Sequence, residues 1–198
     1  NWGVVDVSSP SDVINTQAIF HPLRTTKQGA PMVDVSYGPE TFNLNLIYIP
    51  VQRAPQLPSK DSRWLPREVL IDQNVAELGT NLKFPRLLEY EYEQPDTQSH
   101  ALNNNAGAKL SSHIGSWDIQ FMHFQGAAPS PKIKPTIRLD AGGVMKNPTP
   151  LQQVNYLVRT SGFGFVWARE KWIYRGESVY SHTVSEDPYL PRYSWQSV

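Results

Sequence analysis

The chain has 198 residues, a formal net charge of zero and no cysteine. This length allows one domain with a sizeable core, and the balanced charge gives no general attraction to nucleic acid or anionic lipid. The absence of cysteine excludes disulfides, thiolate catalysis and cysteine-ligated zinc. Only 18% of residues are charged, and 17 prolines are spread along the chain. This composition favours short strands joined by extended segments over a helical bundle.

Three segments alternate apolar and polar residues with the period of a strand. They are 42–48 (Phe42, Leu44, Leu46, Tyr48), 88–92 (Leu88, Tyr90, Tyr92) and 117–124 (Trp117, Ile119, Phe121). Glutamates fill the alternate positions of the second segment, which is typical of a strand with one solvated face. We therefore expect strands at all three places.

Proline-rich segments separate these strands. Residues 50–66 carry four prolines and residues 127–136 carry three, so both are expected to run as extended arms. Between the first arm and the 88–92 strand, apolar residues recur with helical spacing after Pro66. A short helix over about 66–79, ending at Gly79, is predicted there. Residues 94–115 are polar and rich in Gly and Asn, and they are expected to form a long loop.

The densest aromatic segment is 154–175, which we expect to form the centre of the core. Its rings change parity between Trp167 and Trp172, and this predicts a turn in the polar residues 168–171. A second turn at Ser161–Gly162 would make the segment a three-strand meander. A capping-box pattern at 149–152 leaves open a helix over 150–158.

No pattern in the sequence identifies a catalytic or metal site. The five histidines (His21, His100, His113, His123, His182) lack metal-ligand spacing, and His123 is best interpreted as a hydrogen-bonded interior residue. Possible carboxylate pairs, Asp118 with Asp140 or Glu170, are of the kind that any acid-containing β protein supplies by chance. Gly162-Phe163-Gly164 lacks the rest of a dinucleotide fingerprint. We predict no cofactor, no metal, no enzyme activity and no nucleic-acid partner.

Aromatic residues outside the predicted core suggest contacts with other subunits. The aromatic C-terminal tail, 185–198, has no predicted regular structure, and its rings either dock on the same domain or reach a neighbouring subunit. The predicted interface residues are Trp64, Leu65, Tyr189, Tyr193 and Trp195.

Together these features predict one mainly β domain spanning 1–198. It is expected to be an antiparallel sandwich or barrel-like domain with one short helix and long proline-rich extended loops. The predicted function is a structural subunit of a large homo-oligomeric assembly, a virus or bacteriophage virion protein (capsid, collar or tail). Its partners would be copies of itself and other subunits, without membrane insertion, in a virion or otherwise outside the cell. The alternatives are an extracellular carbohydrate- or ligand-binding module and, third, a glycoside hydrolase-like enzyme.

Overall fold

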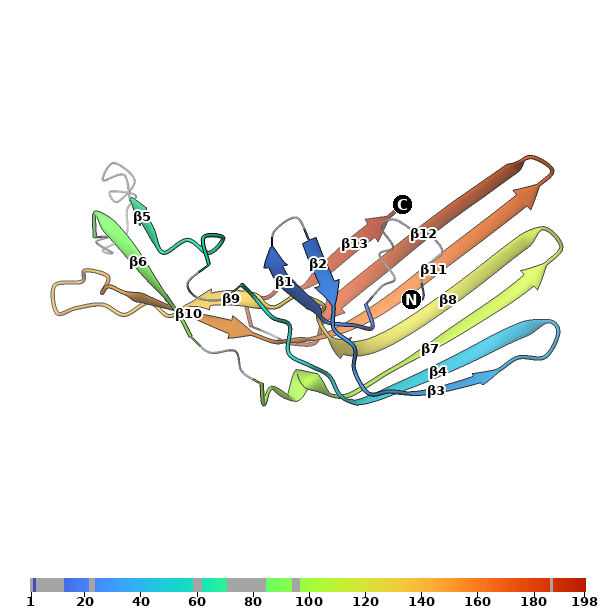
Figure 1. The fold of residues 1–198 in the computed structure, drawn as a ribbon, viewed down its shortest axis with the longest axis horizontal. Coiled ribbons are helices and arrows are strands. Elements are labelled where there is room, and N and C mark those ends of the chain that lie inside the picture. The colour runs from blue at the N-terminus through green and yellow to red at the C-terminus, as the bar shows by residue number, and fades with distance from the viewer. Residues whose placement is uncertain are drawn as a thin grey trace.

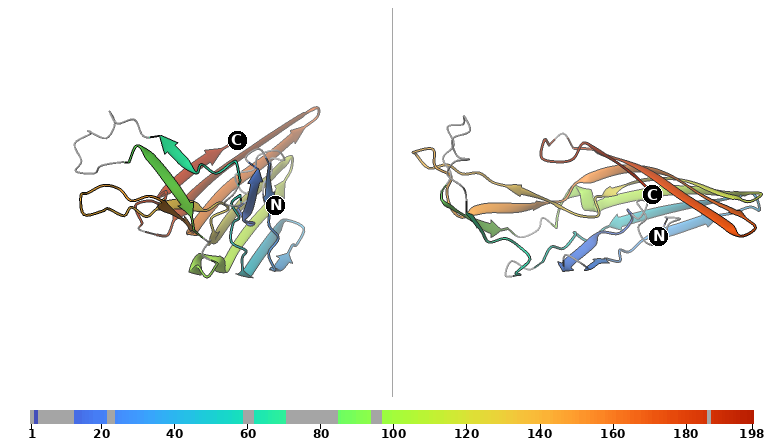
Figure 2. Two further views of the ribbon diagram at one scale, coloured as in Figure 1. Left: turned by 60° about the vertical axis from the view of Figure 1, so that its left-hand side comes forward. Right: turned by 90° about the horizontal axis from the view of Figure 1, so that it is seen from above.

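The computed structural model describes residues 2, 13–21, 24–58, 62–70, 85–93, 97–185 and 187–198. Strands make up 60% of the structure and helices 2%, which confirms the predicted mainly β class. Antiparallel sheets pack as a sandwich-like fold. The molecule is elongated, with a small sheet at one end and long hairpins reaching away from it at the other (Figures 1 and 2).

The largest element is a seven-stranded antiparallel sheet in the order β13-β12-β11-β8-β7-β4-β3. Its central strands form two long hairpins, β7/β8 and β11/β12, which are visible side by side in Figure 1. The strands are β3 (Val33–Tyr37), β4 (Phe42–Val51), β7 (Asn103–Ile114), β8 (Trp117–Ala127), β11 (Leu157–Arg169), β12 (Trp172–Thr183) and β13 (Tyr193–Ser197).

Two smaller sheets and one short helix complete the described fold. A four-stranded sheet has the order β5-β6-β10-β9, in which only the β6–β10 pair is parallel. A two-stranded sheet pairs β1 with β2. These elements are β1 (Gln17–His21), β2 (Arg24–Lys27), β5 (Glu68–Leu70), β6 (Leu87–Tyr92), β9 (Lys132–Pro135), β10 (Thr149–Val154) and the 3-10 helix η2 (His100–Leu102).

The predicted turn within 168–171 is confirmed. β11 ends at Arg169 and β12 begins at Trp172, so Glu170 and Lys171 form a two-residue turn in which Glu170 has a φ of 52°. The predicted turn at Ser161–Gly162 is wrong, because both residues lie inside β11, where pairing on both sides keeps the chain extended. The helix left open over 150–158 does not form, since 149–154 is strand β10.

The core lies against one face of the seven-stranded sheet. Phe124 is fully buried there beside Trp2, Met122 and Ile49. Gly107 and Gly126 make room for its ring, because a Cβ on Gly126 would lie 2.4 Å from that ring. The N-terminal segment therefore supplies the cover for this side of the sheet. A second cluster, around Tyr156 and Val158, includes Leu190 of the C-terminal segment.

Three other predictions are corrected by the structure. Residues 94–115 are not a long loop, because β7 occupies 103–114 and is held in the sheet by pairing with β4 and β8. The predicted helix begins in residues that form β5, and its part from 71 to 79 lies outside the described residues. In the predicted arm 127–136, β9 pairs with β10.

The C-terminal tail contains a strand, contrary to the prediction that it has no regular structure. β13 extends the sheet by pairing with β12, and Val198 exchanges two further backbone hydrogen bonds with Glu177. The tail thus docks on its own domain through its backbone. Two of its aromatic side chains, Tyr193 and Trp195, remain exposed.

Candidate interaction surface

The regular register of the seven-stranded sheet divides its side chains into two faces. Directly paired residues in an antiparallel sheet point to the same side. Successive pairs join Leu110 to Phe121, Phe121 to Phe163, and Phe163 to Ser178, so these four residues share one face. Phe124 and the core lie on the other, which we call the opposite face.

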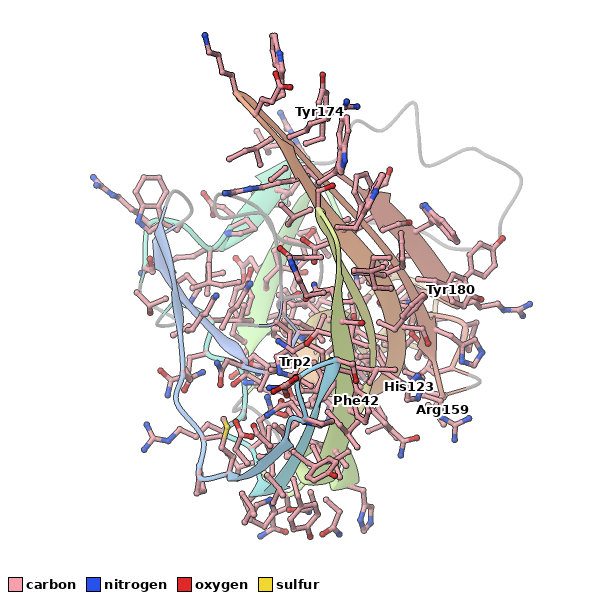
Figure 3. The ribbon with its side chains drawn as sticks, turned by 90° about the vertical axis from the view of Figure 1, so that its right-hand side faces the viewer. Trp2, Phe42, His123, Arg159, Tyr174 and Tyr180 are labelled. Carbon is pink, nitrogen blue, oxygen red and sulfur yellow. The ribbon has the colours of Figure 1, made fainter. Side chains whose placement is uncertain are left out.

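We call the first face the aromatic face. It comprises odd positions 33–37, even positions 42–48, even positions 106–114, odd positions 117–125, odd positions 157–169, even positions 172–182 and odd positions 193–197. Figure 3 views the molecule from the hairpin end, with Trp2 on one side of the sheet and His123, Arg159 and Tyr180 on the other.

Most of the large apolar side chains on this face are exposed. Eleven are aromatic, with exposed fractions between 38% and 70%: Tyr37, Phe42, Tyr48, Trp117, Phe121, Phe163, Trp172, Tyr174, Tyr180, Tyr193 and Trp195. Exposed Val33, Val35, Leu46, Leu110 and Ile114 join them. The prediction that 154–175 forms the centre of the core is therefore wrong for its rings Phe163, Trp172 and Tyr174, which belong to this exposed face. Tyr156 and Val158 of the same segment are buried in the second cluster.

The rings on this face contact one another across three strands. Trp172, Tyr174, Trp167 and Trp117 form a row in which neighbouring rings are stacked, with centroids 5.3–6.4 Å apart and planes within 28°. Phe165 and Phe163 continue the contacts to Phe121, with centroids 5.9, 6.3 and 5.0 Å apart. Phe165 also lies over Gly176, where a Cβ would be 2.5 Å from the ring. The row is consequently packed along the sheet, although its outer surface is open.

Charge on the aromatic face is sparse and of one sign. None of its positions holds Asp, Glu or Lys, and its arginines and histidines are Arg159, Arg169, His123 and His182. The Arg159 Nε donates to Gln125 Oε1 at 2.8 Å, and His123 Nδ1 lies 2.9 Å from Ser161 Oγ. His123 is thus hydrogen-bonded as predicted, but it is exposed rather than interior.

The opposite face carries polar side chains on strands β3, β4, β7 and β8. Asn45 donates to Asp34, while His113 Nδ1 lies 2.6 Å from Asp118 Oδ1. Burial lowers the pKa of Lys109 on this face, and the Asp34 carboxylate opposes that shift. These polar side chains can form hydrogen bonds with water. The ring carbons on the aromatic face cannot, so their exposure to water is unfavourable.

The structure places the predicted interface residues in two regions. Tyr193 and Trp195 lie on the aromatic face, where they are 70% and 69% exposed. Tyr189 precedes β13 and packs against Lys134, whose Nζ is 5.0 Å from the ring centroid. Trp64 and Leu65 lie before β5 of the four-stranded sheet, and the Arg63 guanidinium is 4.7 Å from the Trp64 ring centroid. The structure therefore does not unite the five residues in one site.

The aspartates that the sequence offered as members of carboxylate pairs have other hydrogen-bond partners in the structure. Asp118 pairs with His113, while Asp140 accepts hydrogen bonds from the backbone of Gly142 and Val144 in its own turn. Within the described ranges no three His, Asp or Glu side chains gather as a metal site. Two pockets of about 350 and 300 Å³ lie between the β3/β4 turn and the β7/β8 hairpin and beside the N-terminal segment, respectively.

Sequence reasoning missed most of the aromatic face, including Val35, Leu46 and Leu110. The signal was present in the alternation of 42–48 and 117–124, which correctly predicts one apolar face for each strand. Alternation shows that an apolar face exists, but it does not show whether the same chain covers that face.

Comparison of the chain with protein-family models, curated proteins and solved structures finds no match. In the part of the chain that the structure describes, no helix is long and apolar enough to cross a membrane. A function must therefore be inferred from the surface itself.

Proposed function

We propose that this chain is a structural subunit that assembles with other copies of itself. The observation that carries the proposal is the aromatic face, which spans all seven strands and which no layer of the described residues covers. A sheet face of this kind is normally buried against a second layer.

The extent of the face supports this proposal. The largest exposed apolar patch on a typical monomer is about 300–600 Å². A fully exposed aromatic side chain presents about 150–250 Å², so the eleven exposed rings at roughly half exposure present on the order of 1,000 Å². A standard protein interface buries about 800 Å² on each partner. The rings alone therefore offer enough surface for a stable contact.

A virus or bacteriophage particle (capsid, collar or tail) is the assembly we propose, with other copies and subunits of that particle as partners. This part of the proposal rests on the low charge, the dispersed prolines and the elongated form with its projecting hairpins (Figure 1). A structural role requires neither a catalytic centre nor a cofactor.

The second candidate is a carbohydrate-binding module, and the row from Trp172 to Trp117 is the observation that favours it. Sugars stack on exposed ring faces, but neighbouring rings of this row are stacked on one another. Only the outer face of a terminal ring such as Trp172, 68% exposed, is suited to such stacking. Titrating a broad glycan panel while following tryptophan fluorescence tests this alternative, and a saturable change would favour it.

Sedimentation of the purified chain over a wide concentration range tests the assembly proposal. We expect dimers or larger species, because an aqueous monomer would leave the rings in water. A single monomeric species up to high micromolar concentration would contradict the proposal.

A further inference from the structure

We propose that the aromatic face is covered by the aromatic face of a second copy, related by a two-fold axis parallel to the central strand β8. This inference rests on the proposed self-assembly and names the surface and the symmetry. The two sheets would form a sandwich across the interface, with their strands aligned as in aligned sheet packing.

The distribution of polar residues indicates which face of the seven-stranded sheet needs a second layer. On β3, β7 and β8 the opposite face carries Asp34, Lys109, His113 and Asp118, which are compatible with water. On the half of the sheet nearer the core, Trp2 and the residues around it already cover that face. Among the described residues, no layer lies over the aromatic face along the length of its strands, so the expected partner is another sheet.

The two halves of the aromatic face differ in a way that makes the face self-complementary. Strands β3, β4 and β7 contribute mainly aliphatic and small side chains, such as Leu46, Ala108 and Leu110. Strands β8, β11, β12 and β13 contribute most of the rings. A two-fold axis along β8 reverses the strand order, so β4 of one copy lies over β12 of the other. The aliphatic side chains of β4 in one copy then pack against the rings of β12 in the other copy.

The positions of the arginines favour the axis along β8 over an axis perpendicular to the strands. An axis perpendicular to the strands would place β11 over β11 in the reversed direction, with Arg159 of one copy toward Arg169 of the other. The axis along β8 instead places β11 over β7, whose positions on this face, Ala106 to Ile114, hold no charge. Two arginines facing each other in a desolvated interface are costly, so the axis along β8 is preferred. This axis does set His123 on β8 opposite His123 of the other copy.

The apolar middle of the face argues for a second copy over an acidic partner. Arg159 and Arg169 lie toward the two ends of β11, so carboxylates placed between them, over Leu110, Phe121 and Phe163, would lose water without gaining a counterion. A second copy brings no carboxylate to the contact, and burying about 1,000 Å² on each side falls within the range of stable homodimers.

Introduced cysteines test the arrangement, because the natural chain contains none. Leu44 and Ser178 belong to one cross-strand row on the aromatic face, in β4 and β12. Copies carrying Leu44→Cys mixed with copies carrying Ser178→Cys should be joined by a thiol cross-linker that spans about 10 Å, the distance between packed sheets. Ser178→Cys alone should not cross-link, since its two copies would lie about four strand spacings, or roughly 19 Å, apart. Ser111→Cys, on the opposite face, is the control for random collision.

A matched pair of neighbouring substitutions tests the face itself. Leu110→Glu places a charge on the aromatic face and should weaken association about 100-fold or more. Ser111→Glu places the same charge one residue away on the opposite face and should change the dissociation constant less than about threefold. Leu110 is already 44% exposed, so both variants should fold, and circular dichroism verifies this.

The outcomes separate the inference from the proposed function. Three results together support both the inference and the proposed function: the chain associates, Leu44→Cys cross-links with Ser178→Cys, and Leu110→Glu weakens association. Copies that associate but are insensitive to Leu110→Glu, or that cross-link through Ser178→Cys alone, overturn the inference and leave self-assembly standing. A chain that remains monomeric, with or without glycan binding, overturns both.

Discussion

At the scale of single residues, two phenylalanines on β8 illustrate the difference between the faces. Phe124 is fully buried, whereas Phe121 is 55% exposed. We expect Phe124→Ala to lower the free energy of unfolding of the monomer by about 3–5 kcal/mol, because it leaves a cavity beside Trp2. Phe121→Ala should cost about 1 kcal/mol or less, mainly through the lost ring contact with Phe163. Urea denaturation under monomeric conditions measures both, and equal losses would contradict the assignment of the faces.

Asp187 connects the C-terminal segment to β9 and gives a prediction about pH. Its Oδ1 accepts from the Tyr189 backbone at 3.0 Å, and the Lys134 Nζ donates to its Oδ2 at 2.9 Å. These bonds lower the pKa of Asp187 below the ordinary 3.8. The carboxylate is therefore favoured in the folded chain, and its contribution is present above pH 4 and lost as pH falls through the lowered pKa.

Hydrogen exchange of the Tyr189 amide should report this loss. We expect its protection factor to decrease between pH 5 and pH 2 in the natural chain. Asp187→Asn keeps an oxygen that can accept from the Tyr189 backbone but removes the titrating charge. In that variant, a protection factor with the same pH dependence would show that another group is responsible.

At the scale of elements, the hairpin turn of β11 and β12 holds one residue in an unfavourable backbone conformation. Glu170 has a positive φ of 52°, a conformation that costs a side chain-bearing residue about 1–2 kcal/mol and suits glycine. We expect Glu170→Gly to raise the free energy of unfolding by up to about 1 kcal/mol. Thermal denaturation measures the change. Lys171→Gly is the matched control, since Lys171 is not among the described residues with positive φ, and it should be neutral or destabilising.

The strands show how far sequence patterns determine the elements. Alternation predicted β4, β6 and β8, and the parity change predicted the turn after Arg169. β7 was missed because Asn103–Ile114 contains mostly small and polar residues without a hydrophobic alternation. Its extended conformation depends on pairing with strands on both sides, one of which is more than fifty residues away. Such long-range pairing overrides local propensity.

The aromatic segment 154–175 shows why the candidate surface was harder to predict than the fold. A ring-rich strand has the same sequence whether its rings face a core or a second molecule, and burial is the usual outcome for rings. The identity of the covered face depends on where Trp2 and Val13 lie in space. Sequence position alone did not contain that information. Tyr193 and Trp195 lie on the edge strand β13 of this surface, and their role as interface residues stays a prediction.

At the scale of the whole molecule, the proposed contact has a thermodynamic signature. It would bury on the order of 2,000 Å² of mostly apolar surface over two copies, which corresponds to a heat-capacity change of association of about −0.5 to −1 kcal/mol/K. Because the aromatic face holds no carboxylate, raising the salt concentration from 50 to 500 mM should not weaken association, and reduced repulsion between cations would strengthen it. Dilution calorimetry at several temperatures and salt concentrations measures both quantities. A heat-capacity change near zero together with marked weakening by salt would indicate contact through ion pairs elsewhere on the surface.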